Sequence, residues 1–188
     1  MIVRSFLRYA RGETPFSPWT ALAPLGWVAG VLVKARNFAY DHGVVESRAT
    51  ALPVVSVGNL TLGGTNKTPF VEMLVQEIAG KGIRVGIVSR GYKGGATTPE
   101  IVGRSAPGSF AGDEPLLLHH RLPGVPIAVA NDRNEGISLL GREEGVELAV
   151  ADDAFQHRRL RRDVDIVLVD ALCPWGNGRL FPAGLLRE

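Results

Sequence analysis

The sequence predicts an α/β fold: a parallel sheet with helices on both faces, plus an amphipathic or apolar helix at the N-terminus. From residue 53 onward, short apolar runs alternate with amphipathic stretches, the pattern of repeated βαβ units. The 23 glycines among 188 residues exceed the usual share and indicate tight turns or loops that approach a ligand. Hydrophobic residues make up 45% of the chain, enough to form a packed core.

The charge balance and the cysteine content exclude several classes of protein. Lysine and arginine number 21 against 19 acidic residues, so nothing in the overall charge of +2 favours a nucleic-acid partner. Cys173 is the single cysteine, which excludes an internal disulfide framework and is typical of a reducing compartment. We therefore expect no nucleic-acid partner, and the sequence indicates no protein partner.

The N-terminal segment differs from the rest because residues 1–50 carry a net charge of +3. They contain the apolar run Ala21–Val33, which is shorter than the roughly 20 residues that a membrane-spanning helix needs. Lys34 follows this run, where a signal peptide would have small residues. Two interpretations remain: an interfacial helix with Trp19 and Trp27 near lipid headgroups, which the flanking bases favour, or a helix packed on the domain.

The remaining elements follow in order along the chain. The β-branched run 53–57 (PVVSV) precedes a glycine-rich turn and predicts a buried parallel strand. The stretch 69–79 has an apolar stripe of helical spacing, and Pro69 suits a first helical turn. By the same criteria we expect further strands at 83–88, 126–130, 146–151 and 164–169, and helices near 112–120 and at 134–143.

A phosphate-binding loop lies between the first strand and its helix. The pattern G-x-x-x-x-G-K-[ST] wraps backbone N–H groups around phosphates, while its lysine and hydroxyl reach phosphate oxygens and Mg²⁺. Lys67 and Thr68 occupy those positions, whereas Thr61 and Asn66 replace glycines; asparagine tolerates the positive φ of such a bend. An ordinary βα loop is the alternative. The predicted nucleotide-binding residues are Thr61, Leu62, Gly63, Gly64, Thr65, Asn66, Lys67 and Thr68.

Acidic residues follow the predicted strands and helix starts. Asp152 and Asp153 come directly after the strand 146–151, where a phosphate-loop enzyme holds Mg²⁺, although a turn-capping role is the simpler alternative. Asp113 and Glu114 lie at a predicted helix start, where N-capping and service as a catalytic base are equally compatible with the sequence.

Two basic features lie close to these acids in the sequence. Arg90 follows the strand 83–88 and either faces phosphate or lies on the surface. The run from His157 to Arg162 contains four arginines, which form a solvated face or grip an anionic group of a substrate near Asp152.

Five motifs together resemble the family of tetraacyldisaccharide 4'-kinases, the lipid A 4'-kinases. They are Val-Gly-Asn-Leu-Thr-x-Gly-Gly-Thr-x-Lys-Thr-Pro, Ser-Arg-Gly-Tyr, Gly-Asp-Glu-Pro, Asp-Asp-x-Phe-Gln-His-Arg and Gly-Asn-Gly-Arg-Leu-x-Pro-Ala-Gly. The resemblance runs from about Pro15 to Glu188, with the motifs in family order. The sequence departs from the family at Asn66 and Ala154, where the family has glycine.

The resemblance implies an ATP- and Mg²⁺-dependent kinase that phosphorylates the 4'-hydroxyl of a tetraacyldisaccharide 1-phosphate in lipid A biosynthesis. It implies that Asp113 is the catalytic base, that Lys67 is catalytic, and that the metal is held by Thr68, Glu114, Asp152 and Asp153. Its other implied partner is the cytoplasmic face of the bacterial inner membrane, bound peripherally.

The resemblance also implies a domain organisation. Residues 1–48 would form a membrane-associated helical segment and residues 49–188 the phosphate-loop kinase core. Family members continue into a second half with part of the nucleotide site and a histidine partner of the catalytic aspartate. We therefore expect residues 1–188 alone to bind nucleotide weakly and to have little kinase activity.

A second function class shares the Gly-Gly-Thr-x-Lys-Thr core. Membrane-associated switch ATPases of the partitioning and septum-positioning kind use it with a signature lysine just before the two glycines. Leu62 occupies that position here, which favours the kinase over the switch ATPase.

Overall fold

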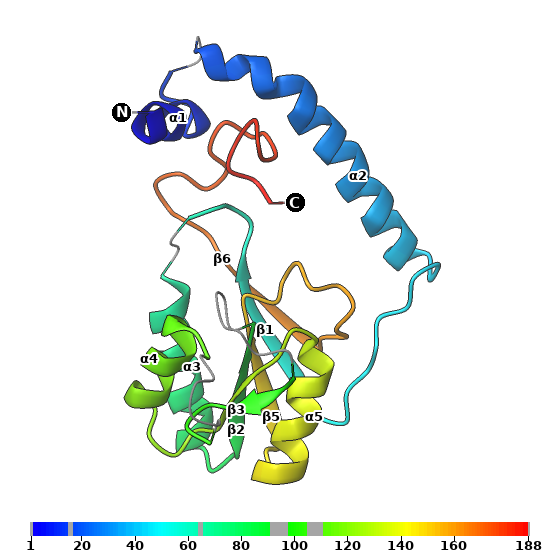
Figure 1. Ribbon diagram of the computed structural model, residues 1–188, viewed down its shortest axis with the longest axis vertical. Helices are drawn as coiled ribbons and strands as arrows, with labels where there is room; N and C mark the ends of the chain where they lie inside the picture. Colours follow the sequence, from blue (N-terminus) through cyan, green and yellow to red (C-terminus); the bar gives the residue numbers. More distant parts are fainter. Residues whose placement is uncertain (1, 15–16, 64–65, 91–97, 105–110, 188) are drawn as a thin grey trace. The chain divides into compact units, whose positions relative to one another are not determined.

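The computed structural model describes the chain in five stretches (Figure 1), which are residues 2–14, 17–63, 66–90, 98–104 and 111–187. The chain divides into two compact units. The first unit comprises residues 1–46, 59–65 and 168–188, and the second comprises residues 47–58 and 66–167. The expected boundary at residues 48 and 49 stays a prediction.

The second unit contains a six-stranded sheet in the order β3-β4-β2-β5-β1-β6. Strands β1, β2, β4 and β5 pair in parallel, while β3 runs antiparallel to β4 at one edge. The strand bounds are β1 Val54–Asn59, β2 Val85–Ser89, β3 Glu100–Ile101, β4 Ile127–Val129, β5 Leu148–Asp152 and β6 Val164–Leu168. The predicted α/β class and its largely parallel sheet are confirmed. Strand β3 was not predicted, because two residues are too few to show a period-2 pattern.

The helices of this unit are α3 (Lys67–Gly80), α4 (Asp113–Arg121) and α5 (Arg133–Glu144). The connections through α3 and α4 move toward one edge of the sheet, whereas α5 leads back from β4 to the central strand β5. Since such crossovers are right-handed, this reversal puts α5 on the face opposite α3 and α4, as Figure 1 shows. The predicted helices on both faces are therefore confirmed.

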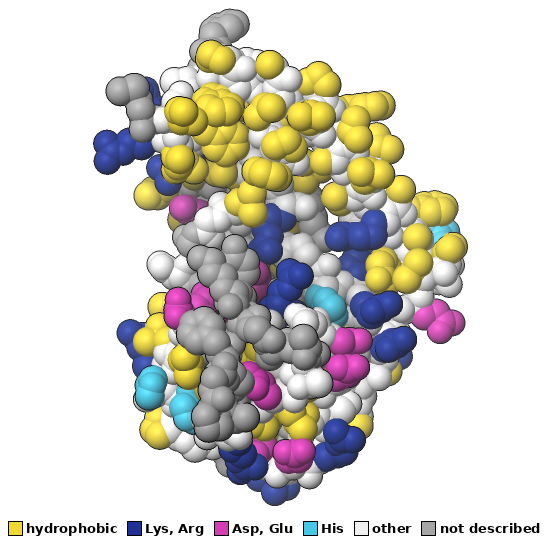
Figure 2. All heavy atoms as spheres, in the orientation of Figure 1, with side chains coloured by type: hydrophobic (Ala, Val, Ile, Leu, Met, Phe, Trp, Pro, Cys, Tyr) yellow, Lys and Arg dark blue, Asp and Glu magenta, His cyan; other side chains and the backbone are white. Residues whose placement is uncertain are grey.

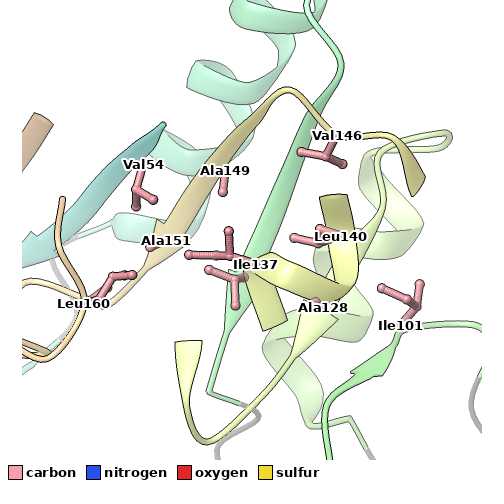
Figure 3. Close-up of a cluster of buried hydrophobic side chains, with 11 residues drawn as sticks. Val54, Ile101, Ala128, Ile137, Leu140, Val146, Ala149, Ala151 and Leu160 are labelled. Atoms are coloured by element: carbon pink, nitrogen blue, oxygen red, sulfur yellow. The ribbon is translucent and has the colours of Figure 1, made fainter. Parts of the chain in front are cut away.

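One cluster of buried hydrophobic side chains lies between α5 and the sheet. Ile137 and Leu140 of α5 point toward small and β-branched side chains of the strands (Figure 3). Gly136 lets the helix approach closely, because a Cβ there would lie 2.7 Å from the side chain of Val88. Gly145 ends α5 in the left-handed conformation at φ 61°, a common C-terminal cap. This packing fixes the ends of β4 and β5, where the polar residues follow.

The first unit contains α1 (Ile2–Ala10), the 3₁₀ helix η1 (Pro18–Leu22) and α2 (Ala23–Asp41). Helix α2 extends well beyond the apolar run 21–33, and its N-terminus includes Pro24, which suits a first helical turn. Among the 19 residues of α2, all of them described, Gly26 alone is buried. No helix in the described stretches has the length and apolarity that crossing a membrane requires.

Helices α1 and α2 contact the segment 176–183 of the same unit. The phenol oxygen of Tyr9 lies 3.1 Å from Arg179 Nη1, which donates to it, and the N–H of Asn177 donates to the carbonyl of Ala10 at 2.7 Å. Gly26 lies against Ala183 so closely that a Cβ at position 26 would be 2.6 Å from the Cβ of Ala183. A glycine is therefore required where α2 meets this segment.

Candidate functional site

The predicted phosphate loop begins at the carboxyl end of β1, beside the end of β5. The parallel register pairs Val57 of β1 with Asp152 of β5, so the loop after β1 and the acids after β5 leave the same edge of the sheet. Ligand sites of parallel α/β sheets lie at this edge.

The first residues of the loop belong to the first unit. Thr61 is buried, and its carbonyl accepts a hydrogen bond from the side chain of Asn59 at 2.7 Å. The N–H of Leu62 donates to the carbonyl of Leu185 at 2.7 Å, and Gly63 has a φ of 124°, which favours glycine. The loop therefore depends on residues near position 185, a long-range contact that no local pattern indicates. The predicted residues Gly64 and Thr65 lie outside the described residues.

The last residues of the loop start helix α3 in the second unit. Asn66 adopts the left-handed conformation at φ 52° and ψ 35°, which confirms that asparagine can take the place of glycine at this bend. Lys67 and Thr68 are the first two residues of α3, so their side chains and N–H groups lie at the positive end of the helix dipole.

Lys67 meets one of the two predicted acids after β5. Its Nζ lies 3.4 Å from Oδ1 of Asp153, and its side chain is largely buried. Asp153 has a φ of 49°, an uncommon conformation for aspartate that turns the chain immediately after the strand. This ion pair therefore orients the lysine toward the end of β5.

Asp152 is a buried carboxyl group in negative surroundings. Burial raises its pKa to about 6, and the charges of Glu114 and Asp153 act in the same direction. Lys67 opposes this shift. A positive charge beside this carboxyl group therefore favours its ionised form.

The N-terminus of α4 adds a second acid to this group. The hydroxyl of Thr68 lies 3.3 Å from Oε1 of Glu114, to which it donates. Asp113 is exposed and is the first residue of α4, while Gly112 takes the cap position. N-capping, one of the two roles open to Asp113 from the sequence, is therefore not realised, and its role as a base stays a prediction.

The oxygens of Thr68, Glu114, Asp152 and Asp153 are ligands of the type that Mg²⁺ prefers. Within the described residues, no three His, Cys, Asp or Glu side chains converge as a preformed metal site. Mg²⁺ at such sites usually takes only one or two carboxylates and completes its shell with phosphate and water. The hydroxyl and the buried carboxyl group therefore fit this ion.

The sequence prediction missed Arg133, the first residue of α5. Its side chain is only 4% exposed, and its Nε has no hydrogen-bond partner among the described residues. Burial lowers its pKa to about 10, the charge of Arg90 adds to this effect, and Asp153 and Asp152 oppose it. A positive side chain at a helix N-terminus interacts unfavourably with the helix dipole. The arginine directly after the cap residue Asp132 is therefore unusual, and this was the feature of the sequence that could have marked Arg133 as functional.

The arginine run after β5 does not behave as one feature. Arg161 is exposed, as a solvated face predicts, but the side chain of Arg162 is only 13% exposed. Arg162 contacts backbone carbonyls and Asp165, so it is neither solvated nor directed at a substrate. Arg90 is exposed, and the rest of its Ser-Arg-Gly-Tyr motif after position 90 lies outside the described residues.

The first unit presents a separate candidate surface. Hydrophobic side chains gather over its helices in Figure 2. The exposed hydrophobic residues of α2 include Trp27 at 73% exposure and Leu32 at 65%. Trp19, by contrast, packs edge-on against Phe6 at 5.3 Å between ring centres. Both interpretations of this segment stay predictions, because α2 exposes these side chains and also packs Gly26 against Ala183.

Comparison with known proteins identifies the family. The family model of LpxK, described as tetraacyldisaccharide-1-P 4'-kinase, matches residues 18–188. The chain belongs to this family. The tetraacyldisaccharide 4'-kinase of Syntrophotalea carbinolica is 42% identical over 193 residues, which cover 97% of the chain and 54% of that protein.

A solved structure agrees with this assignment. The LpxK of Aquifex aeolicus, in a crystal structure described as an "apo" form in complex with ATP, has a TM-score of 0.82 and 36% sequence identity. The match covers 92% of the chain and 55% of that structure. The chain thus spans about half the length of the relatives it matches. Membership of the tetraacyldisaccharide 4'-kinase family does not favour the switch ATPase alternative.

Proposed function

We propose that this chain provides the ATP-binding and phosphoryl-transfer site of a kinase that phosphorylates the 4'-hydroxyl of a tetraacyldisaccharide 1-phosphate in lipid A biosynthesis. The proposal rests chiefly on the charged cluster at the sheet edge. There, Lys67 and Thr68 at the start of α3 meet Asp153 and Glu114 within 3.4 Å. The family relatives supply the reaction by name, and the Aquifex aeolicus structure is described as an ATP complex.

The roles follow from the chemistry of phosphoryl transfer, which needs positioning and neutralisation of charge more than covalent chemistry. Lys67 and the N–H groups at the start of α3 bind the β- and γ-phosphates of ATP. Thr68, Glu114, Asp152 and Asp153 would hold Mg²⁺, which when bound would neutralise charge on the phosphates. Asp113, which is exposed at the same edge, accepts the proton of the sugar hydroxyl.

Arg133 adds a buried positive charge to this site. It acts electrostatically on Asp152 and Asp153, and its unpaired Nε leaves a donor for an anionic group. Arginine suits a phosphate oxygen because its planar fork offers several donors at once. We assign it the stabilisation of negative charge on the transferring phosphate.

The first unit would bind the acceptor lipid at the membrane. Exposed Trp27, Val31 and Leu32 of α2 form an apolar surface, and α1 adds exposed Ile2 and Val3 beside basic side chains. A cavity of about 570 Å³ in this unit is lined largely by apolar groups of α2 and of residues 178–183. Lys34 and Arg179 line the same cavity and suit the phosphate of an acylated sugar.

These features support peripheral binding to the cytoplasmic face of the bacterial inner membrane, where ATP is available. Cosedimentation with vesicles of anionic and of zwitterionic phospholipid tests this part of the proposal. Binding that requires the anionic vesicles is expected, and equal retention by both kinds would contradict the role of the basic side chains.

Transfer of radiolabelled γ-phosphate from ATP to the lipid acceptor tests the enzymatic part. The acceptor is a tetraacyldisaccharide 1-phosphate, with a 4'-deoxy analogue as the negative control. Because we expect residues 1–188 alone to have little kinase activity, the expected result is a low level of label, on the first lipid only. Asp113→Asn should abolish transfer and leave ATP binding intact, whereas the exposed Glu143→Gln should change neither. Full transfer by Asp113→Asn would remove that residue from the proposed mechanism.

A further inference from the structure

The side chain of Arg162 lies against the loop after β5, and only 13% of it is exposed to solvent. Its Nη1 donates to the carbonyl of Ala154 at 3.1 Å and also to the carbonyl of Phe155. Its Nε lies 3.2 Å from Oδ1 of Asp165, and its guanidinium carbon lies 5.6 Å from the centre of the Phe155 ring. One part-buried side chain therefore contacts two consecutive carbonyls and the ring of this loop.

The backbone around Arg162 is itself fixed to β1 and to the segment before it. Asp163 donates its N–H to the carbonyl of Val54 at 2.9 Å, and its carboxylate accepts the N–H of Val54 at 2.7 Å. The N–H of Arg161 donates to the carbonyl of Arg48 at 2.9 Å. The guanidinium therefore projects from an anchored backbone.

The other side of the loop rests on β1. Phe155 lies against Gly58 so closely that a side chain at position 58 would collide with its Cβ. Ala154 is fully buried between these contacts. The loop is therefore held from two directions, by Gly58 and by Arg162.

These contacts bear directly on Asp153, which precedes the two carbonyls. Its left-handed conformation, at φ 49°, is unfavourable for aspartate and persists only where neighbouring contacts hold it. The carboxylate of Asp153 in turn lies 3.4 Å from the Nζ of Lys67. A loosened loop would lose both the turn and this orientation.

We infer that Arg162 is a positioning residue: it fixes the loop from Asp153 to Phe155 and so holds the carboxylate of Asp153 opposite Lys67. This inference rests on the proposed ATP site, since Lys67 and Asp153 act there. This role differs from both roles considered for the arginine run from its sequence, which were exposure to solvent and binding of an anionic group of the substrate.

The inference is tested by measuring the affinity for Mg²⁺–ATP of Arg162→Lys, both alone and combined with Asp153→Asn. Arg162→Lys keeps the charge, but an ammonium group cannot bridge two carbonyls and Asp165 in the fork geometry of guanidinium. We expect a loss of Mg²⁺–ATP affinity of roughly five- to tenfold in the unsubstituted protein, and less than about twofold in the Asp153→Asn background. The exposed neighbour Arg161→Lys is the matched control and should change affinity by less than about twofold.

Two further variants keep the outcome unambiguous. If Arg162→Lys does not fold, Asp165→Ala replaces it, because it removes the partner of Arg162 Nε and leaves the arginine in place. Equal losses of affinity in the two backgrounds, with thermal stability lowered alike, would overturn the inference and leave Arg162 a purely structural residue.

Lys67→Ala distinguishes a failure of this inference from a failure of the proposed ATP site. If the unsubstituted protein binds Mg²⁺–ATP and Lys67→Ala does not, the ATP site stands whatever Arg162 does. If the unsubstituted protein does not bind, both proposals fail.

Discussion

Helices α2 and α5 use apolar side chains in opposite ways. In α5, 12 residues long, Arg133, Gly136, Ile137 and Leu140 are buried, whereas Gly26 alone is buried in α2, 19 residues long and fully described. The apolar residues of α5 pack on the sheet, and the charged cluster of Lys67, Asp153 and Glu114 lies at the edge of that sheet. Many apolar residues of α2, among them Trp27 and Leu32, are instead exposed.

The largest effect expected from this contrast concerns stability. Ile137→Ala removes a fully buried side chain of α5 and should lower the free energy of unfolding by about 2–5 kcal/mol, because it leaves a cavity in the core. Leu32→Ala in α2, where the side chain is 65% exposed, should change it by less than about 0.5 kcal/mol. Urea unfolding followed by circular dichroism measures both, and equal losses would remove the distinction between the two helices.

The next largest effect concerns the charged cluster alone. Lys67→Ala should weaken binding of Mg²⁺–ATP by about 10- to 100-fold, since charge-assisted hydrogen bonds to phosphate contribute about 1.5–3 kcal/mol. Lys81→Ala, which alters an exposed lysine directly after α3, is the matched control and should bind normally. Isothermal titration calorimetry is the measurement, and unchanged affinity in Lys67→Ala would refute the phosphate-loop assignment.

The pKa of Asp152 gives a pH-dependent prediction of intermediate size. Because burial raises this pKa to about 6 from an ordinary value of 3.8, the native state holds a proton there that the unfolded state has released. Asp152 therefore makes stability fall as the pH rises from about 4 to about 6. Asp152→Asn should remove this dependence and stabilise the protein above pH 6 by on the order of 1–3 kcal/mol.

Urea unfolding of Asp152→Asn and of the unsubstituted protein, compared at pH 4 and pH 8, measures this difference. The exposed Glu143→Gln serves as the control and should keep the pH dependence of the unsubstituted protein, because it retains Asp152. A variant that is less stable than the parent at pH 8 would show that the carboxylate has a compensating partner.

The smallest effect concerns the exposed face of the first unit. Trp27→Ala should weaken binding to anionic phospholipid vesicles by roughly fivefold, because it removes part of the apolar area that would enter the interface. Met73→Ala alters an exposed apolar residue of α3 in the second unit and should leave vesicle binding unchanged. If the two variants lose binding equally in cosedimentation, the exposed apolar residues of α2 have no special role.

The elements that the sequence predicted correctly are those with a local signal. The run PVVSV, the glycine-rich turn and Lys67 lie next to one another in the chain, so strand, loop and helix could be predicted together. Arg133 could not be placed in the same way, because its closeness to Asp152 and Asp153 arises only when β4 and β5 enter one sheet. Likewise, a run of arginines is polar at every position, so its pattern does not show which guanidinium turns inward.

Gly26 has a practical consequence for the study of α2. It is the point at which the helix meets Ala183 without space for a further carbon. A Gly26→Ala substitution would add a single methyl group and force the helix away from this segment, while leaving every charge and every exposed side chain of α2 as they are. A substitution at position 26 can therefore alter how α2 packs on the segment around Ala183 without changing the exposed side chains of the helix.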